Sequence, residues 1–492
     1  MSSLQNHSDT PTLSLGTFVR EVFLQYLRLA LFLVILPLGA WILPPLVLLS
    51  GFVIAVSLWM MHRLVGLFNL KELTIPSFFY YIYFAVILIP GFFVFGEEIT
   101  PSRGRFLFGI ESVIVTVPVG IWLANQVLNF RRQETTNYFR QPVAADYLGV
   151  SATRVYVTFL ALALILVLIN LWETPTVPLF FLIRNPGEAM AAALLREDSF
   201  KLLKSHFTYA YFVLRGTVFP FLIMVAFGRY RQKRQGSWKL LFLVSLLLGI
   251  FYASITIEKS PVATILGLLG LFYYLYNGGR IGKAATILVP ALFVSFPLVV
   301  ILLGFQGSEG GTLGGALAAI GSRLFSSPAQ VVYAYFELFP TTIPFQHGAS
   351  LLKLAYLMGW KTVDIPNAVG LYMTEGTPGA IDTISANCCF IGNFYADFGL
   401  PGVIVSGVVA GFLMQWVNVY LCRKPKTVTN LAAYAICFWA LGFLVSSALS
   451  TQMLSGGVAF ALMLGWIFKE RGAPLASHGW YGIKPAHGTA HT

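Results

Sequence analysis

Residues 152–172 read ATRVYVTFLALALILVLINLW, an apolar run in which the one charged side chain is Arg154. At 1.5 Å per residue, a helix of this length matches the hydrocarbon core of a bilayer, which is about 30 Å thick. The run lacks the alternation of apolar and polar residues that is typical of a barrel strand. It therefore predicts a transmembrane α-helix.

Similar runs recur along the 492-residue chain, which is 57% hydrophobic and only 11% charged, with a mean hydropathy of +0.76. A soluble protein could not cover this much apolar surface with so few polar side chains. We expect an all-α polytopic membrane protein with about twelve transmembrane helices, because lipid offers the backbone no hydrogen-bond partners. The predicted spans are 29–43, 44–61, 78–96, 107–128, 152–172, 208–228, 239–257, 261–277, 285–304, 400–421, 430–449 and 452–468. The first two share the Pro44-Pro45 break and could form one kinked element.

The net charge of +12 is explained by where Lys and Arg lie between these spans. If both termini are inside, most of them fall on the cytoplasmic side, including Arg131, Arg132, Lys233, Arg234, Arg423 and Lys424. The positive-inside rule then sets the orientation, with both termini in the cytoplasm. The expected surrounding is a lipid bilayer, and no nucleic-acid partner is needed to account for the charge.

Two outer segments are longer than the other connections. The chain is therefore predicted to consist of a cytoplasmic N-terminal segment, a transmembrane bundle with an outer loop, a large periplasmic loop, C-terminal transmembrane helices and a disordered cytoplasmic tail, at residues 1–28, 29–304 (outer loop 173–206), 305–386, 387–468 and 469–492. A connection as long as 305–386 usually has its own structure and often carries function.

Local signals predict short helices in the large loop. Ser327-Pro328-Ala329-Gln330 has the form of a capping box with proline at the first helical position. The helix that it starts would carry an apolar face and end at Pro340, the face being formed by Val331, Val332, Tyr335, Phe336 and Phe339. A further amphipathic piece, residues 349–358, could lie along the membrane surface or roof a cavity.

A break is predicted where the chain returns to the membrane. Gly399, Pro401 and Gly402 interrupt the apolar pattern between a short helix and the span 400–421. A broken helix at membrane depth is tolerated only where it is buried or lines a cavity.

The sequence carries few motifs of soluble enzymes. It has neither a GxxxxGK[ST] loop nor an HExxH motif, so energy for a reaction would come from an activated substrate or an ion gradient. No cofactor and no metal site are expected. The four cysteines have the spacing of apolar fillers rather than of a disulfide framework, at Cys388, Cys389, Cys422 and Cys437.

Three stretches resemble the Wzy-type polymerases of bacterial O-antigen and exopolysaccharide pathways. They are Ser322-Arg323-Leu324-Phe325, Phe345-Gln346-His347-Gly348 and Gly392-Asn-Phe-Tyr-Ala-Asp-Phe-Gly-Leu-Pro-Gly402, within residues 320–405. The last stretch contains the Tyr-Ala/Gly-acidic-Phe-Gly-x-x-Gly pattern of that family. The chain departs from the Arg-x10-Gly element of some members, because Ala334 stands eleven positions after Arg323.

The resemblance implies a GT-C-like, metal-independent glycosyltransferase in the bacterial inner membrane. It would polymerise undecaprenyl-pyrophosphate-linked oligosaccharide repeat units into a surface polysaccharide, with lipid-linked glycans as both donor and acceptor. A chain-length regulator and a flippase are the implied partners.

Candidate site residues follow from charge placement together with this resemblance. Arginines suit bidentate binding of pyrophosphate, and a carboxylate or imidazole could activate the acceptor hydroxyl. The predicted catalytic residues are Arg323, Asp397, His347 and Glu337. The predicted substrate-binding residues are Arg215, Arg196, Lys353, Tyr395, Asn393 and Tyr335.

Three other functions share these features. An O-antigen ligase has a similar span count and large loop, and it transfers the glycan to a lipid A core. A lipid-linked oligosaccharide flippase or other transporter would use intramembrane charges along a central path, although the chain lacks a repeat between halves. A non-catalytic scaffold or channel is the third.

Overall fold

The computed structural model describes residues 45–93, 100–144, 150–185, 208–280, 321–348, 364–374 and 386–468, and a few positions between 188 and 195. The chain forms two compact units, Met1–Trp59 and Met60–Thr492, and the described part of the first is residues 45–59 of α2 (Pro45–Val65). The described residues are helical and contain no strand. The predicted helix at 349–358 and the tail at 469–492 lie outside them.

Seven described helices are long and apolar enough to cross a membrane, at Ile75–Phe93, Pro101–Val127, Thr153–Glu173, Tyr209–Lys233, Gly236–Ser254, Phe390–Cys422 and Leu449–Ile467. Each coincides with a predicted span. Three further predictions fall on shorter apolar helices, at Ser50–Val65, Ser260–Tyr276 and Val428–Gly442. The predicted spans 29–43 and 285–304 lie outside the described residues. The described part of the chain is thus all-helical, and its apolar helices are those of a polytopic membrane protein.

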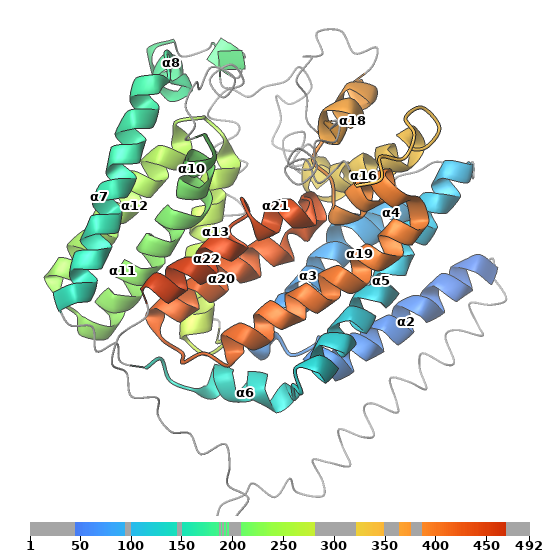
Figure 1. Ribbon diagram of the computed structural model, residues 1–492, viewed down its shortest axis with the longest axis horizontal. Helices are drawn as coiled ribbons and strands as arrows, with labels where there is room; N and C mark the ends of the chain where they lie inside the picture. The colour runs from blue at the N-terminus through green and yellow to red at the C-terminus, as the bar shows by residue number, and fades with distance from the viewer. Residues whose placement is uncertain are drawn as a thin grey trace, which may run out of the picture. The chain divides into compact units, whose positions relative to one another are not determined.

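The helical elements follow one another with short connections in most of the described chain (Figure 1). The bounds are α3 (Ile75–Tyr83), α4 (Ile89–Phe93), α5 (Pro101–Val127), α6 (Arg132–Arg140), α7 (Val150–Glu173), α8 (Pro178–Arg184), α10 (Thr208–Val213), α11 (Phe219–Lys233), α12 (Gly236–Ser254), α13 (Lys259–Tyr276), α16 (Ser327–Leu338), α18 (Ile365–Thr374), α19 (Phe390–Cys422), α20 (Val428–Gly442), α21 (Leu449–Met453) and α22 (Val458–Ile467).

Helices α5 and α19 form the most extensive helix pair of the second unit. Glycines allow their backbones to approach closely: a Cβ at Gly120 would lie 2.0 Å from the Val408 carbonyl oxygen, and one at Gly411 would lie 2.2 Å from that of Val117. In lipid, where apolar burial does not drive helix association, such close packing of small residues holds helices together. The pair forms the platform on which the candidate site is built.

Proline shapes α5 from within. Pro118 has no N–H, so the carbonyl of Ile114 loses its helical donor. The Tyr80 hydroxyl of α3 donates to that oxygen at 2.7 Å and supplies the missing hydrogen bond. Buried Tyr80 thereby links α3 to α5 at the carbonyl that Pro118 leaves without a helical donor.

Three π-helical turns share one sequence feature. They are η2 (Phe84–Leu88), η3 (Leu214–Val218) and η4 (Ser322–Ser326), and a proline stands two positions after each, at Pro90, Pro220 and Pro328. The ring of a proline clashes with the carbonyl four residues earlier, which favours the wider turn. The chain therefore runs from η4 directly into α16, and the predicted capping box at Ser327 is wrong. The Ser327 hydroxyl instead donates to the Ser322 carbonyl at 3.2 Å.

Candidate functional site

Helix α19 breaks at Gly399, as the sequence predicts. This residue has φ 66° and ψ −154°, a conformation essentially restricted to glycine. Pro401 follows and has no N–H, so the Asp397 carbonyl is without its usual helical donor. The break leaves acceptors at the end of the short helix that precedes it.

The segment after α16 satisfies those acceptors. The backbone N–H of Gln346 donates to the Ala396 carbonyl at 2.9 Å, and that of His347 donates to the Asp397 carbonyl at 3.0 Å. His347 and Gly348 have φ values of 50° and 99°, which turn the chain immediately after the contact. We call residues 345–348 together with 396–399 the Gly399 junction.

Aromatic rings fill the space beneath the junction. Phe336 of α16 stacks on Tyr395 of α19 with 3.7 Å between ring centroids, and Phe345 meets Tyr395 edge-on at 5.9 Å. The Tyr395 hydroxyl donates to the Phe339 carbonyl at 3.3 Å, and the Tyr335 hydroxyl donates to that of Ala386 at 3.0 Å. These bonds fix α16 against α19.

This packing determines what the predicted aromatic binding residues do. Tyr335 and Tyr395 are 0% and 1% exposed, so in this structure their rings support the site and do not face a substrate. Asn393, at 8%, is also buried. The apolar face predicted for the helix is confirmed at Val332 and Phe336, which are fully buried.

The predicted ionisable residues differ in how exposed they are. Asp397 is 2% exposed, beside the kink, whereas His347 is exposed although its backbone binds that of Asp397. Arg323 is exposed on η4, directly before α16. Glu337 is half-buried on α16 and accepts a bond of 3.4 Å from the Tyr372 hydroxyl of α18.

Two arginines near this group were not predicted. Arg103 and Arg105 lie at the start of α5, where the Thr100 hydroxyl caps the backbone N–H of Arg103. Arg103 lies within electrostatic range of the Tyr333 hydroxyl and Arg105 within range of that of Tyr395. The sequence signal was available, because a cation is unfavourable at the positive end of a helix and Arg103 lies in the first turn of α5.

The remaining described candidate, Arg215, belongs to a different group of helices. Its Nη1 donates to Glu258 Oε2 at 2.8 Å and to Thr256 Oγ1 at 3.0 Å, and its guanidinium lies 5.7 Å from the Phe212 ring centroid. Arg215 lies in the first third of the helix Tyr209–Lys233. Its partner Glu258 lies in the connection between α12 and α13, so the charge of Arg215 is balanced near the end of its helix.

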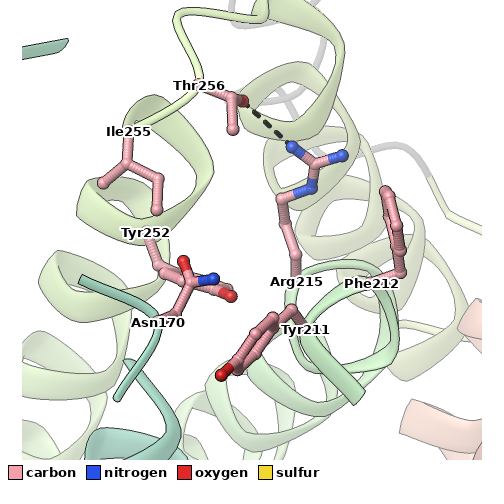
Figure 2. A pocket seen from close by; sticks show the side chains of 7 residues that line it. All are labelled: Asn170, Tyr211, Phe212, Arg215, Tyr252, Ile255 and Thr256. Atoms are coloured by element: carbon pink, nitrogen blue, oxygen red, sulfur yellow. Dashed lines mark hydrogen bonds between the residues drawn. The ribbon is translucent and has the colours of Figure 1, made fainter. Parts of the chain in front are cut away.

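A small hollow borders this ion pair, with room for about one water molecule. Figure 2 shows that the side chains around it come from α7, α10, η3, α12 and the connection after α12, namely Asn170, Tyr211, Phe212, Arg215, Tyr252, Ile255 and Thr256. The elements that carry Arg215 pack with α11, α12, α13 and α22, whereas η4, which carries Arg323, packs with η2, α4 and α16. The two arginines therefore do not belong to one cluster.

The other predicted residues give no further geometry. Arg196 and Lys353 lie outside the described residues. Within the described chain, no group of three or more His, Cys, Asp or Glu side chains could hold a metal ion. The chain matches no protein-family model, no curated protein and no solved structure.

Proposed function

We propose that the chain is a membrane glycosyltransferase that joins oligosaccharide repeat units carried on undecaprenyl pyrophosphate, on the outer face of the bacterial inner membrane. The observation that carries the proposal is the meeting of two distant stretches of sequence, together with a third stretch that leads into the helix packed against them. Segment 345–348 binds 396–399 through the backbone, and η4 with Arg323 leads into α16, which stacks on Tyr395. These are the stretches that resemble the Wzy-type polymerases, and no metal is required in the reaction that the resemblance implies.

The chemistry of the group supports glycosyl transfer from a diphosphate. An acceptor hydroxyl oxygen attacks the anomeric carbon of the donor, the bond from that carbon to the phosphate oxygen breaks, and the lipid diphosphate leaves. Guanidinium groups bind such a leaving group in bidentate fashion and stabilise its developing charge. Arg323 takes this role, with Arg103 and Arg105 adding positive potential at the start of α5. Arg215 is not used, because Glu258 holds it.

The acceptor proton also requires a base. His347 and Asp397 are adjacent across the two backbone bonds of the Gly399 junction, with the imidazole exposed and the carboxylate buried. In the proposal, His347 accepts the proton and Asp397 holds the kinked end of the short helix in place. A chain-length regulator and a flippase are the partners that such a reaction would need on either side of it.

The test uses the purified full-length protein in nanodiscs, supplied with the lipid-linked repeat units of its own organism. We expect a ladder of increasing repeat number on a gel without added nucleotide. Arg323→Ala should slow the appearance of the ladder about 100-fold, because one stabiliser of the leaving group is lost. Arg140→Ala is the matched control, since Arg140 is exposed at the end of α6 and lies outside the site.

Two outcomes would overturn the proposal. Wild-type protein that is folded and leaves single repeats unchanged is not a polymerase. Addition of a lipid A core acceptor would then reveal a ligase, and movement of the intact lipid-linked glycan across the membrane of sealed vesicles that contain the protein would reveal a flippase. Equal rates for Arg323→Ala and Arg140→Ala would remove Arg323 from the mechanism.

A further inference from the structure

A second group of side chains lies on the exposed side of α16, away from the buried Tyr335–Tyr395 packing. Tyr333 and Glu337 are one helical turn apart and so lie on one face of α16. Tyr372 of α18 donates to the Glu337 carboxylate at 3.4 Å, and the Tyr333 hydroxyl lies 3.4 Å from the Thr100 hydroxyl at the start of α5. Three helices, α5, α16 and α18, thus contribute to one polar surface.

The electrostatics of this surface are mixed. Burial raises the pKa of the Tyr333 phenol above its usual value, and the neighbouring Glu337 carboxylate adds to the rise. Arg103 lies in electrostatic range of the same phenol and opposes it. The surface therefore offers a carboxylate that accepts hydrogen bonds, a guanidinium that donates them and phenols that do both.

Aromatic and apolar surface accompanies these polar groups. Tyr372 is 37% exposed and its neighbours Leu371 and Met373 are each 41% exposed. Neither α16 nor α18 is among the candidate membrane spans. A purely apolar surface here would suit lipid. The Glu337 carboxylate, with the phenols of Tyr333 and Tyr372 beside it, does not, because acyl chains offer a carboxylate no hydrogen-bond partners.

Sugars combine the two properties that this surface offers. A pyranose has an apolar face of C–H groups, which an exposed tyrosine ring covers, and an edge of hydroxyls, which carboxylate and guanidinium groups bind. The negative charge of Glu337 would repel a free phosphate. A peptide does not require a tyrosine ring and a carboxylate side by side.

We propose that Tyr333, Glu337 and Tyr372 form a saccharide subsite that binds the incoming acceptor sugar on the exposed side of α16. The inference rests on the proposed function, because it names the part of the substrate that this side of α16 holds. Tyr372 and Glu337 act in binding and not in the chemical step, so their loss raises the KM for the acceptor and leaves kcat near the wild-type value.

The probe is the repeat-unit oligosaccharide released from its lipid diphosphate, observed by saturation-transfer NMR with nanodisc-embedded protein. We expect Tyr372→Ala and Glu337→Gln to weaken its binding at least about tenfold, since each removes a hydrogen-bond partner or a stacking ring. Tyr372→Phe keeps the ring and should lose less. The matched control is Tyr420→Ala, because Tyr420 is similarly exposed, at 38%, near the opposite end of α19.

The outcomes separate this inference from the proposed function. Unchanged oligosaccharide binding and acceptor KM in Tyr372→Phe, Tyr372→Ala and Glu337→Gln overturn the subsite, even if wild-type protein forms a ladder. Loss of binding in these variants supports the subsite even if no ladder forms, and the polymerase proposal then falls alone. If Tyr372→Ala does not give a single gel-filtration peak, Tyr372→Phe and Glu337→Gln decide.

Discussion

At the residue scale, Gly399 has the strictest requirement of any residue in the junction. Its positive φ is one that L side chains rarely adopt, and the Phe345 ring lies 3.0 Å from where a Cβ would stand. The backbone conformation is strained for any L side chain, and the Phe345 ring would have to shift to make room for one. The sequence predicted a break here from glycine and proline, but the partner of the break could not be predicted, because backbone amides 50 residues away leave no side-chain signal.

Gly399→Ala should therefore lower the free energy of unfolding by about 1–3 kcal/mol. The measurement is thermal unfolding in detergent, followed by intrinsic fluorescence. Gly270→Ala is the matched control, because Gly270 lies in α13 and no neighbouring side chain or backbone lies within 4 Å of where a Cβ would stand. There alanine should be neutral or slightly stabilising. Equal midpoints for the two variants would contradict the strain argument.

At the element scale, prolines determine where the helices widen, bend or need help from a neighbour. Their positions could be predicted to disturb the helices. What the sequence could not show is how each disturbance is resolved, by a π-turn before Pro90, Pro220 and Pro328 or by a hydroxyl at Pro118. The capping-box prediction failed for this reason: the Ser-Pro pattern fits both a helix start and a helix that continues through a π-turn.

The bond from Tyr80 to the Ile114 carbonyl is testable by a double-mutant cycle. Tyr80→Phe should destabilise the protein by about 1–3 kcal/mol, because a buried carbonyl is left without a donor. In a Pro118→Ala background the same change should cost less, since the substituted alanine restores a helical N–H to that carbonyl. Additive effects in the unfolding midpoints of the four proteins would show that the two residues are uncoupled.

At the scale of the whole molecule, connections that the sequence assigns to one side of the membrane contact each other in the structure. Arg423 Nε at the end of α19 binds Glu134 of α6 at 2.9 Å, and both were predicted to be cytoplasmic. Thr100 and Tyr333 meet on the predicted outer side. Hydropathy was sufficient to predict which of these connections share an end of the helices, because spanning depends on averages over many residues, and the assignment of one end to the cytoplasm stays a prediction. The Arg215–Glu258 pairing and the Arg103–Arg105 group depend on single contacts and were not predicted.

Single-cysteine labelling tests the sidedness directly. A membrane-impermeant maleimide should label His347→Cys in intact spheroplasts, because residue 347 is exposed in the predicted periplasmic loop. Arg140→Cys, exposed at the end of α6, should react only after the membrane is permeabilised. The wild-type chain is the background control, since three of its four cysteines are buried. Labelling of both variants from the same side would contradict the topology.

The docking of residues 346 and 347 through peptide groups has a consequence for how this protein can change over time. Any residue except proline can supply the amide at 346, and at 347 the residues that accept a positive φ, such as Asn and Asp, can replace His. The backbone docking therefore does not depend on which side chains these two residues carry, and the scaffold stays the same when a side chain changes. In the proposed reaction His347 is the base, so residue 346 is the position of the pair at which the side chain can change while both the docking and the chemistry are kept.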